Sequence, residues 1–309
     1  MDIRVTDFEN KLTYILNLEY RITIIEGNSA TGKSELVRRL DDSENRQISV
    51  ISPMPIMHIN SKVLRLTKTL RDDIIYIMDE TDNIEDHDMV NIINNSKCKF
   101  ILITRNTTLP NINYGIRQIY YFRNSGKYNI LTKLYNIDNI NVDVSKLQSI
   151  VTEDSGSGKK FYEKTLNMNI SSSNGNSNIS NYMSNNQCII IDELGFGPYI
   201  KLVYRKLKNS NIALIYPRSF EYLILISGIL GLINNFDDNY DINHAEKYYY
   251  KKLREICQEY NLKYNKGDID DWFLVKSQSD KIISKIHELF GIDLRNINRC
   301  NTNNYFNWG

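Results

Sequence analysis

Residues 27–34 form the run in this chain whose residue types and spacing are best suited to chemistry. The run matches the phosphate-binding pattern G-x-x-x-x-G-K-[ST] at every position. In such a loop the glycines let the backbone wrap around a phosphate, Lys33 reaches the β and γ oxygens, and Ser34 offers its hydroxyl to Mg²⁺. We therefore expect the whole run to bind a nucleotide: Gly27, Asn28, Ser29, Ala30, Thr31, Gly32, Lys33 and Ser34.

The segments on either side of this run predict the strand and the helix that a phosphate-binding loop needs. Residues 21–26 are mostly apolar and read as a short strand, and residues 34–40 carry Leu and Val at helical spacing. A glycine-containing turn that matches the pattern by chance is the alternative. The flanking strand and helix favour a nucleotide site, with ATP and Mg²⁺ as the expected ligands.

A second apolar strand, residues 73–78, ends in two acids, Asp79 and Glu80. The carboxyl end of such a buried strand lies beside the phosphates in a parallel sheet. We expect Asp79 to hold Mg²⁺ and Glu80 to polarise the attacking water, a pairing suited to ATP hydrolysis. A solvated acidic turn is the alternative, because residues 81–88 are acidic as well. The combination with Lys33 favours an ATPase.

Residues 99–104 predict a third buried strand whose polar end would face the γ-phosphate. Asn106 is expected to sense this phosphate, and Thr104 is an alternative for the same role. Arg105 either reaches a phosphate, in its own or a neighbouring subunit, or faces solvent at the end of the strand. The predicted catalytic residues are Lys33, Glu80 and Asn106.

Predicted strands alternate with helical stretches along most of the chain, which is typical of an α/β fold with a parallel sheet and helices on both faces. In the first half the strands are expected at 21–26, 47–51, 73–78, 99–104 and 117–122. The length of 309 residues suits two cores. We expect a P-loop NTPase domain over 1–140, a second α/β domain over 147–235 and a mostly helical extension over 236–309.

Composition and charge exclude several classes of protein. Lys and Arg number 38 against 37 Asp and Glu, so the chain has no overall basic character for nonspecific nucleic-acid binding, although a local patch is compatible with it. The four cysteines show no C-x-x-C spacing, which argues against a zinc site or a disulfide framework. The first residues lack the features of a signal peptide, and the longest apolar stretch, 222–236, is shorter than the roughly 20 residues of a membrane span. We expect a cytoplasmic protein without a membrane partner. The sequence is compatible with an oligomer.

Residues 153–160 resemble a second phosphate-binding loop, because Gly156, Gly158 and Lys159 follow a predicted strand. Glu153 stands where the first glycine belongs, and Lys160 stands where Ser or Thr belongs. We therefore do not expect this loop to cradle a phosphate.

The acids of the second half follow a recognisable layout, with Glu153 after its first predicted strand and Asp192 and Glu193 after its third. This layout resembles a Toprim domain, whose acids hold Mg²⁺ in topoisomerases, primases and the overcoming-lysogenization-defect nucleases, the last of which also carry an ATPase. The resemblance implies that Glu153 and Asp192 bind Mg²⁺ and that nucleic acid is a partner. Leu194 stands where Toprim enzymes place a second Asp, and only the adjacent Glu193 is acidic. This departure argues against a two-metal cleavage site, while a single Mg²⁺ held by Glu153 and Asp192 is compatible with it. Acids that cap helices or face solvent are the alternative.

Four segments are similar to a family of uncharacterised ATP-binding proteins from Firmicutes and their mobile elements, namely 123–128, 151–158, 191–197 and 217–225. The resemblance spans most of the chain and implies a role in phage or mobile-element biology. The resulting hypothesis is a Mg²⁺-dependent P-loop ATPase coupled to a Toprim-like domain that acts on nucleic acid. The alternative is a nucleotide-switched scaffold or interaction protein, with a protein partner and a catalytically silent second domain.

Overall fold

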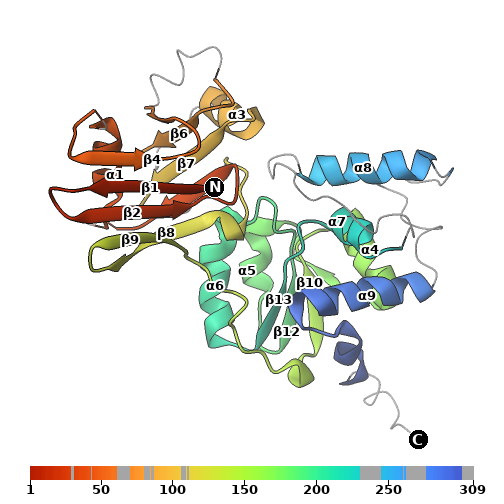
Figure 1. The fold of residues 1–309 in the computed structure, drawn as a ribbon. Helices are drawn as coiled ribbons and strands as arrows, with labels where there is room; N and C mark the ends of the chain where they lie inside the picture. Colours follow the sequence, from red (N-terminus) through yellow and green to blue (C-terminus); the bar gives the residue numbers. More distant parts are fainter. Residues whose placement is uncertain are drawn as a thin grey trace, which may run out of the picture. The chain divides into compact units, whose positions relative to one another are not determined.

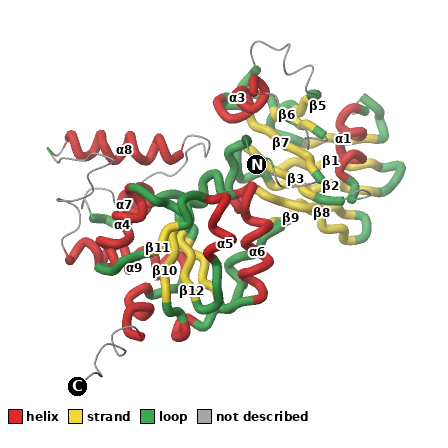
Figure 2. Tube along the Cα trace, turned by 180° about the vertical axis from the view of Figure 1, so that it is seen from behind, coloured by secondary structure: helices red, strands yellow, loops and turns green. Residues whose placement is uncertain are grey.

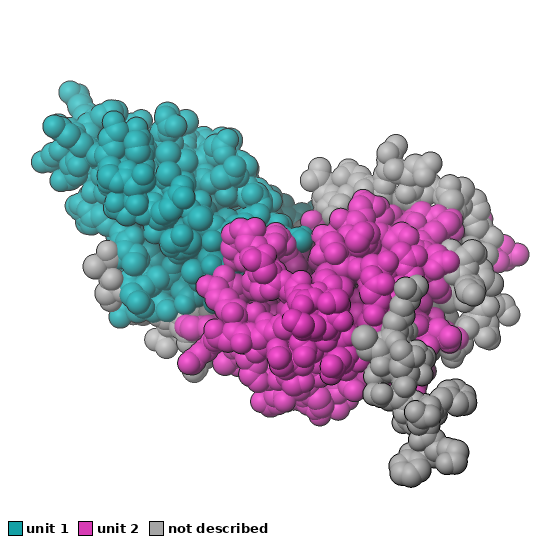
Figure 3. Space-filling view, turned by 90° about the horizontal axis from the view of Figure 1, so that it is seen from below, with its two compact units in different colours: residues 1–135, 241–243 teal, residues 136–240, 244–309 magenta. Residues whose placement is uncertain are grey.

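The computed structural model describes residues 1–28, 31–42, 44–60, 70–79, 84, 87–105, 109, 111–229, 245–259, 261 and 276–300, with the backbone alone at 245–247, 276–278 and 298–300. Over these residues the chain is a mixed α/β protein with a large curled sheet of nine strands and a separate parallel sheet of four (Figure 1). The sheets belong to two compact units that divide between Tyr135 and Asn136 and are coloured separately in Figure 3. No helix in the described ranges combines the length and the apolar character needed to cross a membrane.

The first unit contains the nine-stranded sheet, in the order β4-β1-β2-β9-β8-β3-β7-β6-β5. Its strands are β1 (Asp2–Asp7), β2 (Leu12–Asn17), β3 (Ile22–Glu26), β4 (Ile48–Ile51), β5 (Ile56–His58), β6 (Ile75–Met78), β7 (Lys99–Thr104), β8 (Ile119–Ser125) and β9 (Tyr128–Lys133). Strands β8, β3, β7, β6 and β5 are parallel to their neighbours in that order. Strand β1 is antiparallel to β2 and β4, β9 is antiparallel to β8, and β2 is parallel to β9.

The parallel sheet predicted for the first half is therefore wrong as a description of the whole sheet, which is mixed. The strand predicted at 47–51 forms as β4, but it lies at one edge of the sheet and pairs antiparallel with β1. In β1, Ile3 and Val5 are buried while Asp2 and Arg4 are exposed. This alternation is typical of a half-buried antiparallel strand, and it differs from the continuous burial along β3, β6 and β7.

Helix α1 (Lys33–Asp41) covers one face of this sheet and begins directly after the 27–34 loop. Its buried residues Leu36 and Val37 share a core with apolar side chains of β1, β2, β3, β6, β7, β8 and β9. Gly32 precedes the helix with φ of +83°, a left-handed conformation that glycine adopts without strain. The helix therefore starts at the carboxyl end of β3, where the sequence predicts it.

Helix α3 (His87–Asn95) packs on the opposite face, where Arg21 holds it against the sheet. The Arg21 guanidinium donates to the carbonyls of Ile93 in α3 and Cys98 before β7, at 2.5 and 2.8 Å, and lies 5.6 Å from the centre of the Phe100 ring. Both faces of β3, β6 and β7 are thus covered, which explains why consecutive side chains of these strands are buried.

A buried ion pair ties α1 to β1. The Arg39 guanidinium donates through Nε to Asp7 Oδ2 at 2.9 Å, and the two side chains are 3% and 5% exposed. Burial by itself raises the pKa of Asp7, but hydrogen bonds from Asn10 and the charge of Arg39 outweigh that effect and leave the pKa below its ordinary value. The ionised carboxylate is therefore the form that the folded protein stabilises.

The second unit contains a parallel sheet in the order β11-β10-β12-β13 (Figure 2). Its elements are β10 (Ser149–Thr152), α4 (Ser157–Leu166), β11 (Ser171–Ser172), α5 (Ile179–Tyr182), β12 (Gln187–Ile190), α6 (Ile200–Asn209), β13 (Ile212–Ile215) and α7 (Phe220–Ile226). Figures 1 and 2 both show α5 and α6 on one side of the sheet and α4 on the other. The strands and helices alternate along the chain, as the sequence predicts.

Two further helices belong to the second unit, α8 (Ala245–Glu259) and α9 (Lys276–Phe290). Tyr249, Leu253 and Ile286 from these helices are fully buried in the same core as Ile150 of β10 and Phe161 of α4. The helices therefore share the hydrophobic core of the parallel sheet. Short 3₁₀ turns complete the chain at Ile116–Gln118, Val144–Lys146, Asn176–Asn178, Gly197–Tyr199 and Leu294–Cys300.

We predict that Asp7→Asn lowers the free energy of unfolding by about 3 kcal/mol at pH 7, because it removes the carboxylate that faces the buried Arg39 charge. Because the pKa of Asp7 is lowered by folding, its contribution is complete above the unfolded-state pKa of about 4 and is lost as the pH falls below it. Urea titrations of both proteins between pH 7 and pH 3 should therefore converge at acidic pH. Arg38→Gln, on the exposed side of the same helix, is the control and should change little. A difference that stays constant with pH would contradict the assignment.

Candidate functional site

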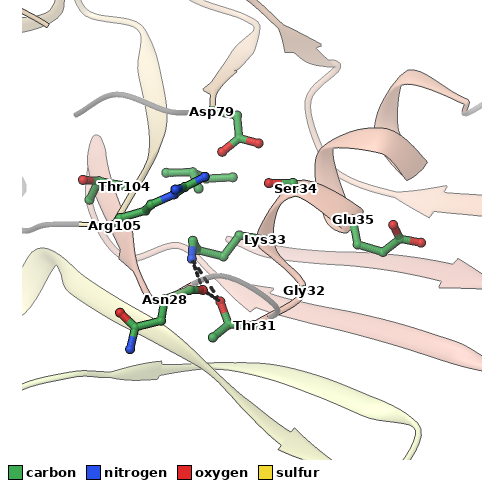
Figure 4. A pocket seen from close by; sticks show the side chains of 10 residues that line it. Asn28, Thr31, Gly32, Lys33, Ser34, Glu35, Asp79, Thr104 and Arg105 are labelled. Atoms are coloured by element: carbon green, nitrogen blue, oxygen red, sulfur yellow. Dashed lines mark hydrogen bonds between the residues drawn. The ribbon is translucent and has the colours of Figure 1, made fainter. Parts of the chain in front are cut away.

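A cavity of about 200 Å³ opens at the carboxyl ends of β3, β6 and β7 in the first unit (Figure 4). The residues that line it come from the 27–34 loop, from the start of α1 and from the ends of β6 and β7, and they are Asn28, Thr31, Gly32, Lys33, Ser34, Glu35, Asp79, Ile103, Thr104 and Arg105. The sequence predicts that these three strand ends meet. The structure shows that they do.

The Lys33 side chain is 7% exposed and is held by the loop that precedes it. Its Nζ donates to the Asn28 carbonyl at 2.9 Å, to Thr31 Oγ1 at 3.0 Å and to the Gly27 carbonyl. A Cβ at Gly27 would lie 2.8 Å from Thr31 Oγ1 and 3.2 Å from Lys33 Nζ. Glycine is therefore needed at position 27 for the loop to close around the ammonium group.

Other polar side chains line the same cavity beside Lys33. Figure 4 shows Ser34 at the start of α1, Asp79 after β6 and Arg105 after β7, with the Arg105 guanidinium between the strand ends. A hydroxyl and a carboxylate are ligands that Mg²⁺ accepts, and a guanidinium pairs with phosphate. Among the described residues, the cavity thus presents the cations of Lys33 and Arg105 to an anion and the oxygens of Ser34 and Asp79 to a metal ion.

The remaining residues predicted for this site cannot be placed, since Ser29, Ala30, Glu80 and Asn106 lie outside the described residues. Thr104 is described and is 1% exposed at the end of β7. Its carbonyl accepts a hydrogen bond from the Gly27 N–H at 3.3 Å, which joins the start of the loop to the neighbouring strand.

Sequence reasoning missed the residues that support the loop from behind. Tyr14 of β2 is fully buried, and its hydroxyl donates to the Gly32 carbonyl at 3.0 Å. Tyr14 is buried between the half-buried residues Thr13 and Ile15 of β2, a pattern that indicates burial but not this contact. No local pattern could have linked β2 to the loop, because the two segments meet only when the sheet is complete.

In the second unit, the predicted acids lie at the carboxyl ends of two neighbouring strands. Glu153 follows β10 and Asp192 follows β12 by two residues, and the Glu153 N–H donates to the Ile190 carbonyl at 3.0 Å. The chain leaves β10 for β11 on one side and later returns to β12 on the other, so the strand order reverses between β10 and β12. Ligands of open α/β sheets bind at such a reversal.

Tyr162 of α4 is a buried residue influenced by the acids at this sheet edge. It was not singled out from the sequence. Its side chain is 2% exposed, and its hydroxyl has no hydrogen-bond partner among the described residues. Burial raises the pKa of Tyr162 well above its ordinary value, and the negative charges of Asp192, Glu221, Glu153 and Asp154 raise it further. The Tyr162 hydroxyl therefore lies in the negative field of four acids, one of which, Glu221, is fully buried at the start of α7.

The part of the chain that the structure describes contains no group of three or more His, Cys, Asp or Glu side chains spaced to hold one metal ion. Mg²⁺ commonly takes one or two carboxylates and completes its shell with water. The pairs Ser34 with Asp79 and Glu153 with Asp192 both fit that smaller donor set. A site built from three carboxylates does not fit the described residues.

The glycine-rich run of the second unit binds its own carboxylate. Asp154 Oδ1 accepts from the Gly156 N–H at 2.6 Å, and Oδ2 accepts from the Gly158 N–H at 2.8 Å. These N–H groups lie at the start of α4, where a phosphate-binding loop would present them to its ligand. The expectation that this loop does not cradle a phosphate agrees with that arrangement.

No model of a known protein family matches the chain, and no curated protein matches its sequence. The resemblances to Toprim domains and to the Firmicutes ATP-binding proteins therefore stay predictions from the sequence.

We predict that Gly158→Ala destabilises the second unit by about 2 kcal/mol, because the added Cβ would lie 2.4 Å from Asp154 Oδ2. In an Asp154→Ala background that clash is absent, so the same substitution should cost less. Urea unfolding of the four proteins in this double-mutant cycle measures the coupling. Equal costs in both backgrounds would show that Asp154 does not hold this turn.

Proposed function

We propose that the first unit is a Mg²⁺-dependent P-loop ATPase. The observation that carries the proposal is the cavity at the carboxyl ends of β3, β6 and β7, where Lys33, Ser34 and Asp79 face a common space. The run 27–34 matches the phosphate-binding pattern throughout, and its lysine is held in the loop by backbone carbonyls. Both the sequence pattern and the spatial arrangement therefore support a nucleoside triphosphate as the ligand.

Each residue of the proposed site has a distinct role in phosphoryl transfer. Lys33 and the loop N–H groups bind the β- and γ-phosphate oxygens, and Glu80 orients and polarises the attacking water. Ser34 and Asp79 would hold Mg²⁺, which neutralises charge on the phosphates. Asn106 would sense the γ-phosphate from the end of β7.

Arg105 adds a positive charge to the same cavity, from a position that the sequence left undecided between phosphate and solvent. Its guanidinium lines the cavity and points between the strand ends. We assign it to phosphate binding within its own subunit, since a guanidinium stabilises the charge that develops on a transferring phosphoryl group.

The second unit is proposed to be a Toprim-like domain that binds one Mg²⁺ through Glu153 and Asp192 and acts on nucleic acid in phage or mobile-element biology. The support is the location of both acids where the strand order reverses, together with the buried Tyr162 hydroxyl that lacks a partner among the described residues. Nucleotide hydrolysis in the first unit would then control the second.

A nucleotide-switched interaction protein is the second candidate function. The observation that favours it is the engagement of Asp154, one of the four acids near Tyr162, in capping the first turn of α4. That acid has a structural role, and the other three could likewise be structural. In this reading ATP binding controls assembly with a protein partner, and the second unit is catalytically silent.

We predict that the wild-type protein releases phosphate from ATP with Mg²⁺ and that Glu80→Gln reduces the rate about 100-fold while ATP still binds. Lys33→Ala should remove both binding and turnover, because it deletes the cation under the phosphates. Lys159→Ala is the matched control, since this lysine follows the other glycine-rich run and pairs with Glu163 at 3.5 Å. Its turnover should equal that of the wild type.

The same assay, repeated with single-stranded and double-stranded DNA, separates the two candidate functions. Stimulation of phosphate release by DNA supports nucleic-acid processing. Tight ATP binding without turnover under every condition contradicts the ATPase and supports the nucleotide-switched interaction protein.

We predict that Asp192→Asn removes a Mg²⁺-dependent rise in the melting temperature of the second unit together with any cleavage of nucleic acid. Asp280→Asn, which changes an exposed acid of α9, is the control and should leave both unchanged. Cleavage that survives Asp192→Asn would exclude this acid as a metal ligand of a nuclease.

A further inference from the structure

Three strands of the first unit place a row of polar side chains behind the 27–34 loop. Tyr14 of β2 is the register partner of Asn129 of β9, and Asn129 is the register partner of Asn124 of β8. Tyr14 is fully buried, and Asn129 is 5% exposed. We call Asn124, Asn129 and Tyr14 the polar row.

One hydrogen bond lies within the polar row and another joins the row to the loop. Asn124 Nδ2 donates to Asn129 Oδ1 at 3.2 Å, and the Tyr14 hydroxyl donates to the Gly32 carbonyl at 3.0 Å. The Asn129 NH₂ group lies beside Gly32 together with the Tyr14 hydroxyl. The Tyr14 proton is then committed to Gly32, the last glycine of the loop.

The fit between the polar row and the loop depends on the missing side chain at position 32. A Cβ at Gly32 would lie 3.1 Å from Tyr14 Oη and 3.2 Å from Asn129 Nδ2, so only glycine allows both groups to approach this closely. The same Gly32 carbonyl accepts from the Leu36 N–H at 3.0 Å and so begins the hydrogen bonding of α1. Lys33 and Ser34 follow Gly32 directly, so this carbonyl fixes the backbone on which the proposed phosphate and metal ligands stand.

The Tyr14 ring is itself held on two sides. It meets the Phe122 ring edge to face, with 5.4 Å between centres, and the Arg39 guanidinium lies 5.8 Å from its centre. Arg39 is the residue that pairs with Asp7 of β1. The hydroxyl is therefore presented to Gly32 by a side chain that has little freedom to move.

From this arrangement we propose that Tyr14 and Asn129 are positioning residues of the nucleotide site, which hold the 27–34 loop in the conformation that binds the triphosphate. The proposal rests on the proposed function of the first unit. It assigns a role to Asn124 within the segment 123–128, which the sequence singles out without a function. Through the loop, Tyr14 and Asn129 would affect binding of the phosphates of the ligand and not of its base.

The test compares Tyr14→Phe with Tyr120→Phe. Tyr120 of β8 lies in the same core, and its buried hydroxyl has no hydrogen-bond partner among the described residues, so both substitutions remove one buried hydroxyl. We expect Tyr14→Phe to weaken binding of ATP and of inorganic triphosphate alike, by about fivefold, the effect of one hydrogen bond. KM for ATP should rise while kcat changes little. Tyr120→Phe should leave both ligands at wild-type affinity.

Hydrogen exchange in the protein without nucleotide gives a second, independent measurement. In Tyr14→Phe the amides of residues 31–36 should exchange faster than in the wild type, with a melting temperature within about 2 °C because the ring still packs. Asn129→Ala should act in the same direction. Its effect should be less than additive with that of Tyr14→Phe, because both side chains adjoin Gly32.

The outcomes separate this proposal from the ATPase proposal. Unchanged exchange at residues 31–36, with affinities within twofold of the wild type, overturns the positioning role even where the wild type hydrolyses ATP. Faster exchange in Tyr14→Phe supports the positioning role even where the wild type binds neither ATP nor triphosphate, an outcome that would overturn the ATPase alone. A fall in melting temperature with unchanged exchange and affinity would make Tyr14 a purely structural residue.

Discussion

A nearly buried ammonium group determines the geometry of the first unit's candidate site. Lys33 is 7% exposed, and a charged amine at that depth requires oxygen partners that replace its water. The partners of Lys33 include three oxygens of the loop, namely the carbonyls of Gly27 and Asn28 and the hydroxyl of Thr31. The lysine and the loop therefore hold each other in place, and the absence of a side chain at Gly27 makes this possible. The cavity, the ends of β6 and β7 and the start of α1 all lie next to this contact between Lys33 and the loop.

The two units use the same architectural principle for different side chains. Each gathers polar groups at the carboxyl ends of parallel strands, where helix N-termini and strand ends converge. In the first unit the glycine-rich loop encloses a cation. In the second, a similar glycine-lysine run encloses Asp154, an anion. The charge at the centre of each loop decides whether its N–H groups are available to an anionic ligand. In the sequence, the two loops differ at the first position of the pattern, which is Gly27 in the first unit and Glu153 in the second.

The sequence predicts the elements whose signals are local. The strand, loop and helix around Gly32 follow from a short pattern, and the acids after β6, β10 and β12 follow from apolar runs that end in charge. The mixed sheet could not be predicted in the same way, because the partner of a strand is not encoded in its neighbours. For the same reason the roles of Tyr14 and Tyr162 were missed. Each depends on contacts that form only after strands or helices distant in the chain have packed.

The pairing of β2 with β9 has a consequence for how the site is made during synthesis. Strands β1 and β2 are adjacent in the chain and can pair early, whereas β9 ends at Lys133. Contacts of such long sequence separation form late, because the intervening chain must be ordered first. On a nascent chain the 27–34 loop is thus complete in sequence well before Asn129 emerges. The Tyr14–Asn129 register behind the loop forms only when the last hairpin of the unit joins the sheet, so binding of the proposed nucleotide would report that this unit has finished folding.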